Sequence, residues 1–210
     1  MHSIKSSFDE LELYLLELEE NYIDTHQDPM ETPDDYKFDV RSYCVLSHAA
    51  FEEFVENVCV YVLDKVVDEF ELNKKISISS LCLMHFKSGD THTYIDDDKW
   101  KNSDRIYDYL LGQFKKIKDD FSKYIMTKNH GVGLKYLKQL LIPLGIDIPL
   151  DPIHQTALDQ LTKFRGSFAH TSHRAIRHIS PNDARVYVYD VYDYMQSLAK
   201  TTENITYYKY

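Results

Sequence analysis

The sequence predicts an all-α fold, a helical bundle built around one long spine helix. Only six glycines and six prolines occur among its 210 residues, so long stretches lack the residues that usually interrupt helices. Within these stretches, apolar side chains recur at spacings of three and four, the period of one helix face. A chain of this length can bury a core as one unit, and we expect a single domain over residues 1–210.

The spine helix is predicted between Val40 and Phe70, where the periodic pattern is strongest. Its apolar residues repeat at intervals of seven, four, three and four, which is typical of a helix buried along one face. The residues before it, 28–39, contain Pro29 and Pro33 and are expected to form a loop. The inward residues of the spine are Cys44, Phe51, Val55, Val58 and Val62.

Two helices are expected to flank the spine. The first should begin near Ser7, because Ser7 and Glu10 have capping-box spacing, and run to Tyr22. The last should open at Ser180-Pro181-Asn182-Asp183, which offers a serine cap and a proline at the first helical position. The inward stripes are Leu11, Leu15, Leu18 and Tyr22 in the first helix, and Ala184, Val188, Val191, Met195 and Leu198 in the last.

Four further helices are predicted between these elements: a short one over residues 78–87, a long one over 105–128, and two more over 134–141 and 153–164. The first of them should end at Gly89 and be followed by a polar loop over 90–104. Glycines 131 and 133 could cradle a phosphate, but without a following Lys and Ser/Thr they indicate a turn between helices. The inward stripe of the longest is Ile106, Leu110, Phe114, Ile117 and Phe121.

The three cysteines, Cys44, Cys59 and Cys82, form no CxxC pair and are odd in number. We therefore expect buried thiols in a reducing compartment, without a disulfide framework or a thiolate metal site. The first thirty residues lack the pattern of a secretory signal, and no apolar run approaches the length of a membrane span. A soluble, cytoplasmic protein with no membrane partner is expected.

The most informative segment is the basic region at 161–185. It holds Lys163, Arg165, Arg174, Arg177 and Arg185 against Asp183 alone, in a chain of net charge −10. Such a patch can draw a polyanion to one place on an acidic surface, although charged runs are also commonly just solvated surface.

Arg165 and His170 stand five positions apart in this region. Arginine matches phosphate oxygens as a charged planar fork, and histidine exchanges protons near neutral pH, so the pair suits chemistry on a phosphodiester. On one straight helix five residues rotate the second side chain about 140° from the first. The helix must therefore end or distort near Gly166, or two copies of the chain must combine their residues.

The segment from Leu158 to His170, with Arg165 and His170 in the spacing Arg-x4-His, resembles the signature helix of the HEPN (higher eukaryotes and prokaryotes nucleotide-binding) superfamily. The segment from Arg41 to Val55 is similar to that family's long early helix. The Gly-containing linker at 130–133 and the Leu-Gly-Ile-Asp turn at 144–147 are similar to those of RiboL-PSP-type members.

The resemblance implies an all-α, usually dimeric protein that cleaves RNA without a metal or other cofactor and often serves in toxin–antitoxin or anti-phage systems. Arg165 would hold the scissile phosphate, and His170 would assist proton transfer, leaving a 2′,3′-cyclic phosphate and a 5′-hydroxyl. The implied partners are RNA, a second copy of the chain, and an antitoxin or defence-system protein. Lys163, His173, Arg174 and Arg177 would contact RNA.

Glu52 would support the site, because the family's early helix often presents a polar residue toward the motif. His48 precedes it by four positions and would share its helix face, although the simpler interpretation of the two is a surface ion pair on the spine. His170, His173 and His178 have no recognisable metal-ligand spacing, and the basic surroundings oppose a cation, so no metal site is expected.

The sequence departs from the family pattern at two positions. Gly166 follows the motif arginine where active members commonly carry a polar residue, and Ser172 stands where antitoxin-paired members often carry a tyrosine. Regulation by adenylylation at that tyrosine position is therefore not expected. The first departure keeps open a non-catalytic HEPN module that binds RNA, nucleotide or a protein partner. A helical protein with a purely structural, interaction role is the third reading.

Overall fold

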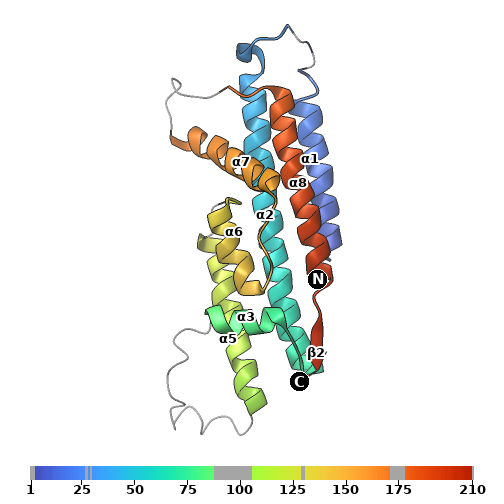
Figure 1. Cartoon of the computed structure of the whole chain (residues 1–210), viewed down its shortest axis with the longest axis vertical. Coiled ribbons are helices and arrows are strands. Elements are labelled where there is room, and N and C mark those ends of the chain that lie inside the picture. Colours follow the sequence, from blue (N-terminus) through green and yellow to red (C-terminus); the bar gives the residue numbers. More distant parts are fainter. Residues whose placement is uncertain are drawn as a thin grey trace.

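The computed structural model describes residues 3–26, 28, 30–87, 106–128, 131–170 and 178–209. It confirms an all-α fold, in which helices pack around one spine (Figure 1). The predicted Gly89 cap and the polar loop over 90–104 lie outside the described residues. No helix in the described ranges combines the length and apolar character that a membrane span requires.

The spine, α2, extends from Pro33 to Asn73, 41 residues in all. It begins seven residues before the predicted start, so the expected loop over 28–39 is wrong from Pro33 onward. The reason is a cap: the backbone N–H and hydroxyl of Thr32 donate to the Asp35 carboxylate at 2.7 and 2.8 Å, and proline suits the first helical position. The five inward residues predicted for the spine are all buried.

Helices α1 (Ile4–Tyr22) and α8 (Pro181–Glu203) pack beside the N-terminal part of α2 (Figure 1). The predicted start at Ser7 is wrong, because the Ser3 hydroxyl already accepts the Ser6 N–H at 3.1 Å. The predicted cap of α8 is confirmed, since the Ser180 hydroxyl accepts the Asp183 N–H at 3.1 Å. The predicted inward stripes are buried, apart from Tyr22, which is half-buried.

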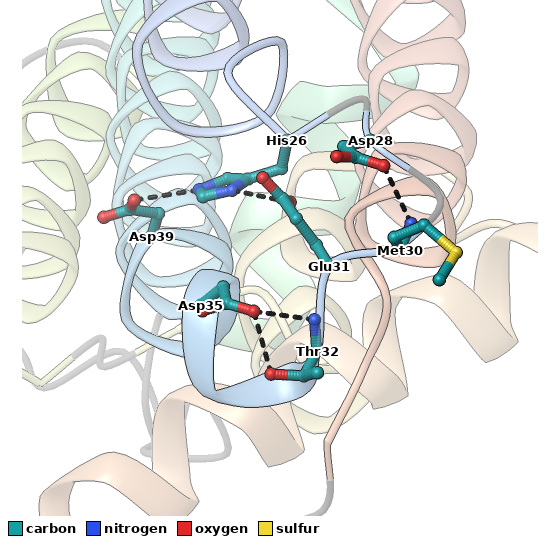
Figure 2. Close-up of polar contacts among 7 residues, drawn as sticks. All are labelled: His26, Asp28, Met30, Glu31, Thr32, Asp35 and Asp39. Atoms are coloured by element: carbon teal, nitrogen blue, oxygen red, sulfur yellow. Dashed lines mark hydrogen bonds and ion pairs between the residues drawn. The ribbon is translucent and has the colours of Figure 1, made fainter.

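The connection between α1 and α2 is held by one imidazole (Figure 2). His26 Nδ1 lies 3.0 Å from a Glu31 carboxylate oxygen, and its Nε2 lies 2.9 Å from an oxygen of Asp39 on α2. Burial disfavours the charged ring, but the hydrogen bonds to the two carboxylates outweigh it and raise the pKa of His26. The protonated ring can donate to both acids at once.

The other half of α2 packs against α3 (Ile78–Lys87) and α5 (Ile106–Lys128), with α6 (Leu134–Leu141) and the 3₁₀ turn η1 (Ile142–Leu144) completing this end. The bounds of α3 and α6 are as predicted. Ile106 is 55% exposed rather than inward. A short antiparallel pair, β1 (Lys75–Ser77) with β2 (Tyr207–Lys209), was not predicted. Cys44 and Cys59 are buried as expected, whereas Cys82 is half-buried.

Helix α7 (Pro152–His170) crosses the spine and packs against both α2 and α8 (Figure 1). It was predicted to end near Phe164, but it continues through Gly166 to His170, the last residue of the Arg-x4-His motif. Nothing in the described part of the chain lies within 4 Å of a Cβ built on Gly166. Because α7 runs unbroken to His170, the glycine causes no break, and the motif is helical throughout.

Candidate functional site

The buried apolar face of α7 determines where the Arg165 side chain lies. Leu158, Leu161 and Phe164 are buried against the rest of the bundle, and this fixes the rotation of α7 relative to α2. The Arg165 side chain remains 43% exposed. Its charged end can therefore reach both solvent and the spine.

The guanidinium of Arg165 approaches the spine at Glu52. Arg165 Nη2 lies 3.8 Å from Glu52 Oε2, and the Glu52 side chain is only 17% exposed. One turn earlier, His48 Nδ1 lies 3.9 Å from the same oxygen. The structure thus brings together three of the residues named from the sequence, Arg165, Glu52 and His48.

His48 is not part of a surface ion pair. Its side chain is fully buried, and neither ring nitrogen has a hydrogen-bond partner among the residues that the structure describes. Burial, together with the nearby charge of Arg165, lowers the pKa of His48 to about 4. The ring is therefore neutral at physiological pH, because the charged form is disfavoured in a buried, positively charged environment.

Gly131, between α5 and α6, packs against the residues of the site. Its φ of +142° is one that residues with a side chain rarely adopt. A Cβ at this position would lie 3.3 Å from His48 Cε1 and 3.8 Å from Arg165 Nη1. The sequence indicated a helix–helix turn here, but not that its backbone packs against the site. The only sequence signal for this contact is the glycine itself.

The remaining predicted residues divide into two groups. His170 lies in the last turn of α7, and its side chain is outside what the structure describes, as are His173, Arg174 and Arg177. Lys163 is 63% exposed and pairs with Asp159 at 2.5 Å, four residues earlier on α7.

Arg185, counted in the basic region, belongs instead to the contact between α1 and α8. It pairs with Glu19 at 2.6 Å and with Asp24, so its charge is matched there. Over the described ranges, no three potential metal-ligating side chains gather in one place.

The described helices form an all-α bundle in which α7 crosses the long spine α2 and brings Arg165 beside Glu52. The family model described as RiboL-PSP-HEPN matches residues 5–204, nearly the whole chain, and the chain belongs to this family. Neither a curated protein nor a solved structure matches the chain. HEPN modules are in general related to ribonucleases, which agrees with the resemblance of the motif helix.

Proposed function

We propose that this protein is a metal-independent endoribonuclease that cuts RNA through Arg165 and His170. The observation that carries the proposal is the placement of Arg165. Its guanidinium is partly exposed and lies beside a carboxylate on a rigid helix crossing, so it can exchange an internal contact for a phosphate. Family membership over residues 5–204 supports the same assignment.

The chemistry requires few protein groups, because the RNA supplies its own nucleophile. The 2′-hydroxyl attacks the adjacent phosphorus, the bond to the 5′-oxygen breaks, and a 2′,3′-cyclic phosphate and a 5′-hydroxyl result. Arg165 would neutralise the charge that builds on the phosphate oxygens. His170 would take the proton of the 2′-hydroxyl or supply one to the leaving oxygen.

We further propose that the protein acts as a homodimer, in a toxin–antitoxin or anti-phage role. Because α7 is helical from Arg165 to His170, its backbone turns about 140° between the two positions. A two-fold pair of motif helices would let Arg165 of one chain and His170 of the other face one phosphate. Lys163, His173, Arg174 and Arg177 would add sequence-independent attraction for RNA.

The test is cleavage of a labelled single-stranded RNA by purified variants. Arg165→Ala and His170→Ala are each expected to abolish cleavage, with helical content and thermal midpoint close to wild type. Lys116→Ala, an exposed cation on α5, and His154→Ala, an earlier histidine of α7, are the matched controls and should cut normally. Full activity in both folded motif variants would refute the nuclease assignment.

A second candidate function is an RNA-binding HEPN module without catalysis. It is favoured by Gly166, which leaves the position after the arginine without a polar side chain although the surrounding space is open. This alternative predicts that no product forms in the cleavage assay. In a parallel binding measurement with the same labelled RNA, wild-type protein should bind and Arg165→Ala should bind more weakly.

A further inference from the structure

One oxygen of Glu52 lies within 4 Å of two side-chain nitrogens, one on His48 and one on Arg165. Oε2 is 3.9 Å from His48 Nδ1 and 3.8 Å from Arg165 Nη2. Both separations exceed the 2.7–3.2 Å typical of a hydrogen bond between nitrogen and oxygen. A small rotation of the glutamate side chain would shorten one contact and lengthen the other.

His48 has hydrogen-bonding capacity that the described structure does not use. The ring is fully buried, and both nitrogens lack partners within the described ranges. At neutral pH it is uncharged, because burial and the Arg165 charge lower its pKa to about 4, so it carries one N–H. The inward neighbours Cys44, Phe51 and Val55 are apolar and buried. An unsatisfied imidazole in such a face reduces the stability of this state, which favours a use for the ring in another state of the protein.

We propose that His48 is a positioning residue for the Glu52 carboxylate. When a phosphate of RNA binds Arg165, the carboxylate leaves the guanidinium and binds His48 instead. This inference rests on the proposed function, since it assumes that Arg165 binds the scissile phosphate. In the resting protein the carboxylate faces the guanidinium and competes with any incoming anion. When the phosphate engages Arg165, Glu52 turns toward His48 and accepts its N–H.

The neutral state of His48 suits this role. A protonated ring would hold the carboxylate permanently, whereas an uncharged N–H offers a hydrogen bond without a fixed ion pair. Gly131 packs on the other side of the ring, 3.3 Å from Cε1 for a Cβ built there, and limits how far the imidazole can move. In the proposed exchange the glutamate is the side chain that moves.

The test measures binding of a single-stranded 2′-O-methyl oligonucleotide, which cannot be cleaved because the nucleophile is blocked. His48→Leu is expected to weaken binding roughly tenfold, the loss expected for about one hydrogen bond. Its thermal midpoint should equal or exceed that of wild type, because an unpartnered polar group is replaced by an apolar one. His48→Gln, which keeps an N–H donor, should bind more tightly than His48→Leu. Ser47→Ala is the matched control, since the Ser47 hydroxyl is also buried without a described partner.

The double variant His48→Leu/Glu52→Gln separates this role from a structural one. Without the carboxylate, His48 has no anion to hold away from Arg165. The double variant should therefore bind RNA as tightly as Glu52→Gln alone. A merely structural loss would persist in the double variant, because the two effects would then add. If His48→Leu does not fold, His48→Met is used in the same cycle.

Failure of this inference differs from failure of the proposed function. If Arg165→Ala binds the oligonucleotide as wild type does, both are refuted. If Arg165→Ala loses binding but His48→Leu binds as wild type does, only the role of His48 is refuted. The same conclusion holds if Arg165→Ala loses binding and the double variant binds less tightly than Glu52→Gln alone.

Discussion

The backbone of Gly131 lies directly against the ring of His48. A Cβ on the glycine would lie 3.3 Å from His48 Cε1, closer than side chains usually approach, and the φ of Gly131 is +142°. The turn between α5 and α6 therefore depends on glycine for both its conformation and its contact with the spine.

Gly131→Ala is expected to lower the free energy of unfolding by about 1–3 kcal/mol, the usual cost of one residue held in an unfavourable backbone region. It should also reduce RNA cleavage, because the added methyl group displaces His48 or Arg165. Urea denaturation and the cleavage assay measure the two effects. Gly112→Ala is the control: Gly112 is exposed on α5 with no atom near its Cβ, and alanine should raise helix stability by up to about 1 kcal/mol. Equal stability of Gly131→Ala and wild type would contradict the expected strain.

Acid should destabilise the protein through His48. Its pKa is about 4 in the folded state against 6.5 when unfolded, so between these values the unfolded chain binds one proton more. Stability should therefore fall as pH decreases from 6.5 to 4, by about 1.4 kcal/mol per pH unit from this group, and change little above 6.5. The measurement is the difference in unfolding free energy between wild type and His48→Leu at each pH. A difference that does not change between pH 7 and 4 would show that His48 does not titrate in this way.

His26 should act in the opposite direction. Its folded-state pKa is raised above 6.5, since its hydrogen bonds to Asp39 and Glu31 outweigh burial. Its contribution to stability is therefore complete below pH 6.5 and is lost as pH rises through the folded-state value. His26→Gln should lower the thermal midpoint most at pH 6 and progressively less toward pH 9. A deficit that grows with pH would be inconsistent with a protonated ring between the two acids.

The sequence predicted those parts of the fold that depend on local chemistry. The inward residues of α2 and the cap of α8 follow from side-chain period and from Ser180, and both are confirmed. The start of α2 differs from the prediction because proline interrupts a helix interior but suits its first position, and Thr32 and Asp35 form the cap of the helix that begins at Pro33. The pairing of β1 with β2 joins residues more than a hundred positions apart, and no local pattern reports such a contact.

The candidate site could also be predicted in part, again from local sequence patterns. Arg165 and Glu52 were named from the motif helix and the early helix, and the structure brings them within 3.8 Å. The burial of His48 could not be inferred from its spacing to Glu52, because a position four residues away shares a face whether that face is exposed or buried. The contact of Gly131 with His48 could not be inferred either, because it depends on a turn that is distant in the sequence reaching the spine.

Cleavage should not require a metal ion. The proposed reaction uses the 2′-hydroxyl of the RNA as nucleophile, with Arg165 and His170 supplying charge and proton transfer. Excess EDTA should leave the rate unchanged, and the 3′ end of the product should carry a cyclic phosphate, detectable by mass spectrometry. An RNA with a 2′-deoxy nucleotide at the cleavage position is the control and should stay intact. Loss of activity with EDTA and its return with Mn²⁺ would indicate metal-assisted hydrolysis instead.

A shared site should be revealed by mixing two inactive variants. If Arg165 of one chain acts with His170 of the other, a heterodimer of Arg165→Ala and His170→Ala contains one intact site and one without either residue. Random exchange of subunits makes half of the dimers mixed, so cleavage should recover to about a quarter of the wild-type rate. The double variant Arg165→Ala/His170→Ala, mixed with either single variant, is the control, because no intact pair can form and activity should stay absent. A mixture that exchanges subunits but stays inactive would place both residues of each site in one chain, and full activity of a wild-type monomer at nanomolar concentration would exclude the shared site altogether.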